Sequence, residues 1–226
     1  EYYKLNYEFS KYWPISRALV LNTRFEVGYG DSYGSDKTLI SCQALPGGPA
    51  IPPGGSSVTT NNAAGSGNCP PGTIETDSFT ATGLPFFENF YAGGARSVRG
   101  YRDNTLGPRD APYGYTDARY MQPIGGSFKT VGSFEMFFPK LFDSPAARIS
   151  AFLDFGNVYK DYDSFDAGEL RASYGIALMW RAPVGPISIS YAFPLRNQGS
   201  KYDANGVQIQ EADEIERLQF TFGGAF

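Results

Sequence analysis

The 226-residue chain contains no histidine and only two cysteines. The missing histidines exclude His-based catalytic triads and remove the side chain that most often acts as a general base near neutral pH. A structural zinc site needs four nitrogen or sulfur ligands, which two cysteines alone cannot supply. We therefore expect no metal site.

Long apolar runs are also missing. The longest, such as Ala18–Leu21 and Ile176–Trp180, fall far short of the roughly 18 residues that a membrane-spanning helix needs. This excludes a helical membrane protein but leaves open a β-barrel, whose strands show only alternation over about ten residues. Basic residues are not in excess either: 19 Lys and Arg against 23 Asp and Glu give a net charge of −4. A surface built to bind nucleic acid is therefore not expected.

The two cysteines, Cys42 and Cys69, lie in a polar stretch rich in glycine and proline. A pair in such a loop predicts a disulfide formed in an oxidising compartment. Closing this loop would add roughly 3 kcal/mol of stability by restricting the unfolded chain. The alternative interpretation is two unrelated thiols.

Aromatic residues are abundant, at 16% of the chain, and apolar side chains alternate with polar ones in seven segments. Such a period of two predicts β-strands with one apolar face. Most segments are about 9 to 13 residues long, which exceeds the usual five or six and matches the length that crosses a bilayer. A soluble β-sandwich would show shorter strands with turns every 8–12 residues. The segments span residues 2–10, 19–29, 128–138, 147–159, 172–180, 187–193 and 218–226.

The connections between these segments alternate between short and long. Outer-membrane barrels have short periplasmic turns and long extracellular loops, so this pattern favours an all-β, antiparallel, up-and-down transmembrane β-barrel whose last strand ends on the periplasmic side. The short connections are Lys11–Ala18, Pro139–Ala146 and Ala182–Gly185, and the long ones are Gly30–Ser127, Lys160–Leu170 and Arg196–Glu214. The aromatic residues expected in interfacial girdles are Tyr12, Trp13, Tyr29, Phe138, Tyr159, Trp180 and Phe226.

Seven strands are an odd number and leave two sheet edges, whose unpaired backbone groups lipid does not tolerate. We therefore expect residues 1–226 to be the C-terminal part of a larger barrel domain, or to close by self-association. The long extracellular loop 31–127 divides in two. Residues 44–82 have the composition of a mobile external insertion. Residues 84–109 carry too many rings to remain in water, and we expect them to dock on the barrel interior.

This docking segment contains the most specific motifs of the chain. With the strand Phe152–Tyr159, the turn Ala182–Pro186 and the aromatic C-terminus, they resemble the BamA family, the barrel subunits of the bacterial outer-membrane β-barrel assembly (BAM) machinery. The resemblance covers essentially the whole chain, and only 31–83 matches poorly. The motifs are Phe87–Gly94, Ser97–Tyr101 and Asn104–Pro108.

The resemblance implies a sixteen-stranded barrel in the outer membrane of a Gram-negative bacterium, of which this chain supplies the last seven strands. It implies N-terminal periplasmic POTRA domains outside this sequence. The implied function is insertion of β-barrel proteins into the membrane, without covalent catalysis, nucleotide, metal or other cofactor. The implied partners are outer-membrane lipids, nascent outer-membrane proteins and periplasmic accessory lipoproteins, and no nucleic acid.

Arg99, in the motif Val98-Arg99-Gly100-Tyr101, is the main candidate for a functional residue. By resemblance, its loop re-enters the lumen and Arg99 pairs with carboxylates on the inner wall. Glu135 and Asp154 lie on the polar faces of adjacent predicted strands, where one planar guanidinium can bridge both. The expected role is to lock the loop against the wall. The alternative is a solvated loop arginine.

The last strand is interrupted by Gly223 and Gly224, which weaken it because glycine lacks a side chain and loses more entropy. A weakened final strand could leave the first strand and expose an edge to which a nascent strand adds. The resemblance implies such a lateral gate, whereas a kink that only curves the barrel is the alternative. The side chains of Phe220, Phe222 and Phe226 also resemble the C-terminal signal by which barrels are recognised for insertion.

Three other functions compete with an insertase. A passive channel or porin would also have a polar lumen, and an open pore rather than a lumen plugged by 86–107 would favour it. A paralogous barrel for secretion or autotransporter assembly would share many of the motifs. Glu135 and Asp154 could form a glycosidase-like acid and base pair, but no nucleophile with a base accompanies them. We therefore expect no enzymatic activity.

Overall fold

The computed structural model describes residues 1–33, 37–44, 59–61, 73–81, 84–110, 121–139, 146–202, 204 and 208–223. The chain divides into two compact units: Glu1–Tyr3 with Asp31–Pro85, and Lys4–Gly30 with Phe86–Phe226. The described secondary structure is nearly all antiparallel β. Its helices are the three-residue 3-10 turns η1 (Phe86–Glu88) and η3 (Ala167–Glu169). None of the described helices is long and apolar enough to cross a membrane.

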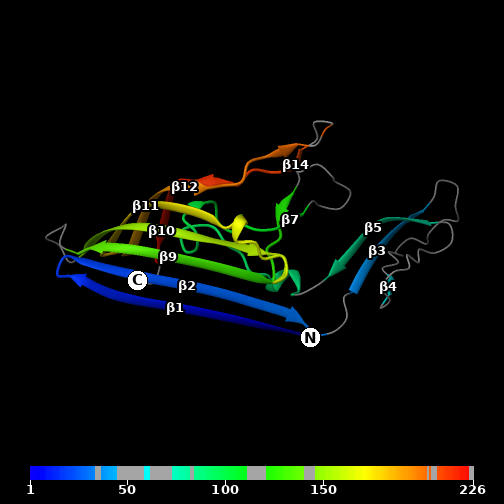
Figure 1. Cartoon of the computed structure of the whole chain (residues 1–226), viewed down its shortest axis with the longest axis horizontal. Coiled ribbons are helices and arrows are strands. Elements are labelled where there is room, and N and C mark those ends of the chain that lie inside the picture. Colours follow the sequence, from blue (N-terminus) through cyan, green and yellow to red (C-terminus); the bar gives the residue numbers. More distant parts are fainter. Residues whose placement is uncertain are drawn as a thin grey trace. The chain divides into compact units, whose positions relative to one another are not determined.

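A seven-stranded sheet dominates the second unit, with its strands side by side in the order β1-β2-β9-β10-β11-β12-β16 (Figure 1). The strands of this sheet lie in the order in which they occur along the chain, which confirms the predicted up-and-down order. In the described residues β1 and β16 form its two edges, so the barrel is not closed within this chain. The strands are β1 (Tyr2–Ser16), β2 (Leu19–Ser32), β9 (Phe128–Phe138), β10 (Ala147–Tyr159), β11 (Arg171–Ala182), β12 (Gly185–Arg196) and β16 (Leu218–Phe222).

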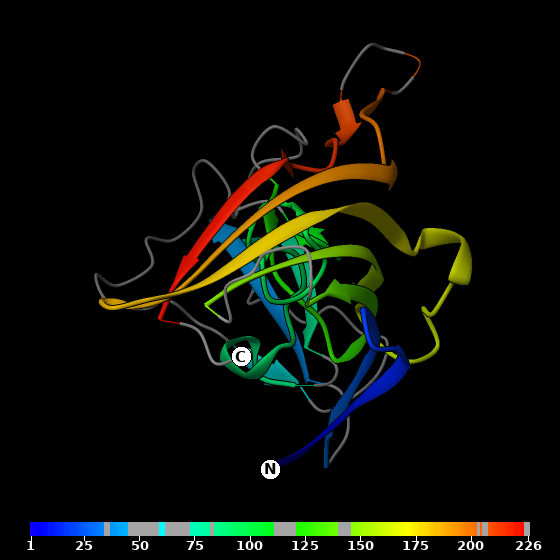
Figure 2. The ribbon, with the colours of Figure 1, turned by 90° about the vertical axis from the view of Figure 1, so that its left-hand side faces the viewer.

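The two faces of this sheet differ as the alternation predicts. Along β10 the side chains of Ser150, Phe152 and Asp154 are buried on the inner face, whereas Leu153 between them is exposed on the outer face. The sheet is curved, and residues 86–110 lie on its concave side (Figure 2). The outer face is a band of exposed apolar side chains, which is the surface that lipid covers in a membrane barrel. This band includes Tyr174, Ile176, Leu178, Ile189, Tyr191, Phe193, Leu218, Phe220 and Phe222.

The first hairpin differs from the prediction. β1 continues through Ser16, so the turn before β2 is only Arg17 and Ala18 rather than the whole of Lys11–Ala18. Pro14 does not end the strand, because an edge strand tolerates a residue that cannot donate to the ladder. Continued alternation places Tyr12 in a cavity on the inner face. Tyr12 is therefore not part of an outward-facing girdle, and that prediction was wrong.

The inserted region is not entirely loop. Its described part contains a three-stranded sheet in the order β4-β3-β5, formed by β4 (Thr59–Asn61), β3 (Lys37–Ala44) and β5 (Thr73–Ala81). The composition of this region did not predict these strands, because glycine and proline dominate the residues between them. Thr73–Ala81 itself is rich in threonine, which favours β-strands. Cys42 lies in β3, but Cys69 is outside the described residues, and so is the predicted disulfide.

The connections between the wall strands alternate between short and long, as predicted. The β11–β12 turn has two residues, Pro183 and Val184, whereas residues 140–145 of the other short connection are outside the described part. β16 ends at Phe222, earlier than predicted, and Gly223 follows with a φ of +74°. Gly224 and Phe226 are not described.

The long connections form short pairs of strands: β6 (Gly100–Tyr101) with β15 (Ile215–Glu216), β7 (Arg109–Asp110) with β8 (Gln122–Pro123), and β13 (Lys201–Tyr202) with β14 (Gln208–Gln210).

Candidate functional site

The segment from Phe86 to Asp110 packs on the inner face of the seven-stranded sheet. Its apolar residues Val98, Tyr101 and Leu106 are almost completely buried. Its two-residue strand β6 forms an antiparallel pair with β15, in the connection that leads directly into β16. The structure thus places the segment on the interior of the wall, as the sequence predicts, and adds a contact with the final strand that was not predicted.

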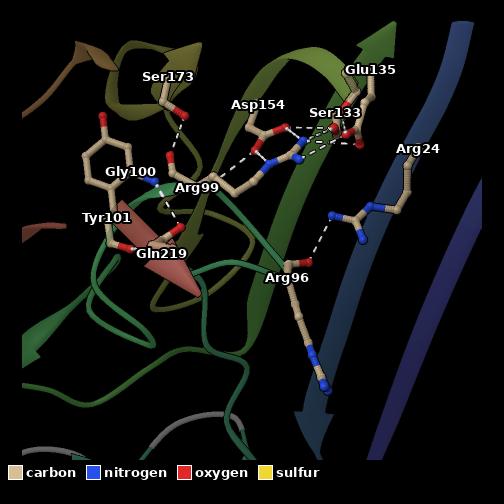
Figure 3. Close-up of polar contacts among 11 residues, drawn as sticks. Arg24, Arg96, Arg99, Gly100, Tyr101, Ser133, Glu135, Asp154, Ser173 and Gln219 are labelled. Carbon is tan, nitrogen blue, oxygen red and sulfur yellow. Dashed lines mark hydrogen bonds and ion pairs between the residues drawn. The ribbon is translucent and has the colours of Figure 1, made fainter. Parts of the chain in front are cut away.

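Arg99 lies against β9 and β10 with its guanidinium between two carboxylates (Figure 3). Its Nε donates to Oδ2 of Asp154 at 2.6 Å, and its Nη2 donates to Oδ1 at 2.9 Å. Its backbone N–H also donates to Oδ2 at 3.2 Å. Its Nη1 and Nη2 donate to Oε1 and Oε2 of Glu135 at 3.2 and 3.4 Å. The planar fork of one arginine therefore joins the segment to two neighbouring strands.

Serines of the inner wall complete the hydrogen bonds of both carboxylates. Ser133 Oγ donates to Oδ1 of Asp154 at 2.7 Å, and Ser150 Oγ donates to Oε1 of Glu135 at 2.5 Å. Ser133 lies directly opposite Asp154 in the β9–β10 register. The Asp154 side chain is fully buried and that of Arg99 is nearly so. Buried charges are tolerated only when they are paired and hydrogen-bonded, and this cluster satisfies both conditions.

Burial alone would lower the pKa of the Arg99 guanidinium. The hydrogen bonds and negative charges of Asp154 and Glu135 outweigh this effect and raise that pKa above its ordinary value, so Arg99 stays charged. The Arg99 guanidinium carbon also lies 3.5 Å from the ring centroid of Phe152, in a cation–π contact. The Ser173 hydroxyl donates to the Arg99 carbonyl oxygen from β11. Three strands of the wall therefore hold this one residue.

Gly100 and Tyr101 are held by the final strand itself. Gln219 of β16 accepts a hydrogen bond from the Gly100 N–H at 3.3 Å and donates through Nε2 to the Tyr101 carbonyl at 2.7 Å (Figure 3). Gly100 has a φ of +92°, and a Cβ at this position would lie 2.9 Å from the Cβ of Ala192. Glycine is therefore required here both for its backbone conformation and for the close approach to β12.

The Tyr101 hydroxyl reaches the ends of two wall strands, where it lies 3.0 Å from the Ala172 carbonyl oxygen and 2.6 Å from that of Arg196. Burial raises the pKa of Tyr101 to about 12, and the negative charge of Asp213 adds to the effect. Asp213 in turn accepts a hydrogen bond from Nε of Arg171 at 2.6 Å. This polar network joins the docked segment to the long connection between β12 and β16.

Three of the contact residues were missed by sequence reasoning. Ser133, Ser173 and Gln219 are ordinary polar residues on alternating strands, and each was expected only to face the lumen. Alternation shows which face a side chain occupies, but it does not show which part of a loop lies opposite. The motif around Arg99 and the two acidic positions, Glu135 and Asp154, identified the charged part of the site, and no corresponding signal marks these three polar wall residues.

The predicted gate residues are described in part. Phe220 and Phe222 are exposed on the outer face. β16 pairs with β12 only through Ile187–Tyr191 and Leu218–Phe222, which is five residue pairs, against eleven pairs between β9 and β10. A Cβ on Gly223 would meet nothing within 4 Å. The described ladder of β16 with β12 is therefore less than half as long as that between β9 and β10.

The site holds a loop in place, and both carboxylates of the acid and base alternative take part in this contact. Glu135 and Asp154 are each ion-paired with Arg99. Among the described residues no three Asp, Glu, Cys or His side chains come together in a way that could hold a metal ion. The contacts that the structure shows fix the segment Phe86–Asp110 on the inner face of the sheet.

An antiparallel sheet with an apolar outer face and a loop fixed on its polar inner face defines the wall of an outer-membrane β-barrel protein. The chain belongs to the Omp85 superfamily, because the family model described as the Omp85 superfamily domain matches residues 1–226. The expected fold class and family are thereby confirmed.

Its relatives include outer-membrane assembly proteins. The chain is 36% identical over 169 residues to the outer membrane protein assembly factor BamA of Neisseria meningitidis serogroup B, a match that covers 63% of this chain and 19% of the relative. It is 34% identical over 116 residues to BamA of Nitratidesulfovibrio vulgaris, covering 50% of this chain and 13% of the relative. The chain thus spans a fifth or less of these curated relatives.

A solved structure of a BamA protein has a similar fold. The crystal structure of BamA from Haemophilus ducreyi lacking POTRA domains 1–3 matches with a TM-score of 0.60 and 25% identity, covering 97% of this chain and 34% of that chain. With the family match, this similarity assigns the chain to the outer membrane of Gram-negative bacteria.

Proposed function

We propose that this chain forms the C-terminal wall of an insertase that assembles β-barrel proteins in the outer membrane. The observation that carries the proposal is the docked segment, which Arg99 fixes to Glu135 and Asp154 inside the wall. A segment held on the inner face by buried ion pairs occupies part of the space that the wall would enclose, which suits a gated assembly machine better than an open pore. The relatives named as assembly factors support the same function. The proposed partners are membrane lipids, nascent outer-membrane proteins and periplasmic accessory lipoproteins.

The proposed mechanism is opening at the final strand. β16 is short and is followed by a glycine with positive φ, so its separation from a neighbouring strand costs fewer ladder hydrogen bonds than separation of any longer strand. The exposed backbone edge would then offer a template for a nascent strand through β-augmentation. This step needs no covalent chemistry, because the binding energy of the new strand pairing supplies the driving force.

The docked segment is placed to control this step. β15 pairs with Gly100 and Tyr101, and Gln219 bonds the same two residues from β16. The wall holds the segment through Arg99, and the segment holds the final strand through Gln219. We therefore propose that docking keeps the gate closed until these contacts are released.

Reconstitution tests the proposed function. The full-length protein that contains this chain is placed in lipid vesicles with its accessory lipoproteins, and a urea-unfolded barrel protein is added. We expect the wild type to accelerate folding of the added barrel, measured by heat-modifiable mobility in electrophoresis. Replacement of Arg99 by Gln should reduce this acceleration at equal amounts of folded full-length protein. Large steady ion currents without any acceleration of folding would instead identify a porin and refute the proposal.

A further inference from the structure

A cavity lined by arginines lies between the docked segment and the inner wall. Its volume is about 580 Å³. Pro139 and Pro186, which adjoin the short connections, line it, so it faces the short-turn end of the barrel, the periplasmic end in barrels of this kind. The arginines in its lining are Arg24, Arg96, Arg99, Arg148 and Arg181.

Three of the lining arginines, Arg24, Arg96 and Arg148, make no ion pair in the described part of the chain. Glu135 lines the cavity, but Arg99 already binds it. Arg24 donates through Nη2 to the backbone carbonyl of Arg96 at 2.9 Å (Figure 3). A concave site lined by one sign of charge focuses the potential, here positive, within a chain whose net charge is −4.

Apolar side chains share the same cavity. Tyr12, Phe137 and Met179 line it together with the arginines. Guanidinium groups bind carboxylates through paired hydrogen bonds, and the apolar surface adds contacts that a small inorganic anion cannot use. The combination suits a polypeptide segment in which acidic and apolar residues are mixed.

We propose that this cavity binds carboxylate-rich segments of unfolded polypeptides that enter from the short-turn end. This inference rests on the proposed function, in which such polypeptides reach the barrel from the periplasm. Arg99 and Glu135 also line the cavity, but Arg96 and Arg148 are exposed and bind neither Glu135 nor Asp154. Their charges can therefore be removed without loss of the docking contacts.

The test measures binding of a short fluorescent peptide rich in Asp, Glu and Leu to the full-length protein in detergent. A matched peptide carries Asn and Gln in place of the acids. We expect the acidic peptide to bind and the amide peptide to bind far more weakly, with added salt weakening the former. The double variant R96Q/R148Q should lose roughly tenfold in affinity, whereas R217Q, at an exposed arginine outside the lining, should bind as the wild type does.

Several results would refute the proposed binding site. Equal binding of both peptides, or unchanged affinity in R96Q/R148Q, would show that the arginines do not recognise carboxylates. Displacement by inorganic phosphate as effective as displacement by unlabelled peptide would indicate a general anion site and refute the polypeptide assignment. If the double variant does not fold, R148Q alone gives the same readout at an exposed side chain.

Insertion of the barrel substrate is measured on the same preparations. Peptide binding without insertion would refute the insertase function and leave this site intact. Insertion without peptide binding would refute the site alone.

Discussion

At the scale of single residues, Arg99 and its two neighbours explain how a loop is held inside the wall. Arg99 supplies charge, Gly100 supplies a backbone conformation that other residues rarely adopt, and Tyr101 supplies a buried ring with a polar end. A chemically similar residue would not provide the same contacts at any of these three positions. Lysine, for example, lacks the planar fork that reaches Asp154 and Glu135 together.

Replacing Gly100 by Ala should undock the loop. Its φ of +92° strains any residue with a Cβ, at a cost of about 1–2 kcal/mol, and the added methyl group would lie 2.9 Å from the Cβ of Ala192. We expect limited proteolysis of the full-length barrel to cut the loop faster in Gly100→Ala. Gly199→Ala is the matched control, because a Cβ there meets nothing within 4 Å. Equal cleavage of both variants would show that the close approach to β12 is not needed.

Tyr101 should ionise later than an ordinary tyrosine. Its pKa of about 12 means that the docked state favours the neutral hydroxyl. The stabilisation is therefore fully present below the ordinary pKa of about 10 and is lost as the pH rises through 12. The difference between ultraviolet titrations of the wild type and Tyr101→Phe should show one tyrosine ionising near pH 12. A difference centred near pH 10 would mean that the ring is solvated.

At the scale of elements, the final strand depends on its contact with the loop as well as on its ladder with β12. Gln219→Leu would leave the Gly100 N–H without its partner in a buried site, at a cost of about 1–3 kcal/mol. We expect faster hydrogen exchange at the amides of β16 in this variant. Thr221→Val on the same strand and face is the control, because the Thr221 side chain makes no hydrogen bond within the described part of the chain. Identical exchange in both variants would remove Gln219 from the proposed gate.

The strands of the wall could be predicted from the sequence because each repeats one simple pattern. Apolar residues such as Leu153 and Ile176 at every second position give both the strand and its outer face. The end of β1 could not be predicted, since Pro14 usually interrupts a strand and is tolerated only where its missing N–H faces no partner. The strands β3 to β5 were hidden by the glycine and proline between them.

Only the charged contacts of the site were predictable from the sequence. The motif around Arg99 and the two acidic positions on adjacent strands identified the charged partners. The supporting contacts of Ser173 and Gln219 depend on how deeply the loop enters the lumen. That depth is set by packing across the whole unit. It cannot be predicted from the local sequence around each polar residue.

At the scale of the whole molecule, the exposed apolar band should face lipid. Ile176 is 60% exposed in the middle of β11, and Tyr202 is 61% exposed in β13. A lysine on the lipid face near the midplane costs about 2–4 kcal/mol. We therefore expect Ile176→Lys to lower the free energy of unfolding in vesicles, and Tyr202→Lys to change it little. Two equally mild effects would indicate that water, and not lipid, covers the band.

The docked loop links these scales, because its ion pairs join the wall and its backbone joins the final strand. A double-mutant cycle with Arg99→Gln and Asp154→Asn in the full-length barrel tests this docking most directly, by free energies of unfolding in urea. Each single variant leaves a buried polar partner unsatisfied and should cost several kcal/mol, about 3–5 if the whole charge is stranded. We predict that the double variant is little less stable than the worse single variant, with a coupling above about 1 kcal/mol. Effects that simply add, within about 0.5 kcal/mol, would contradict the docking of Arg99 against the wall.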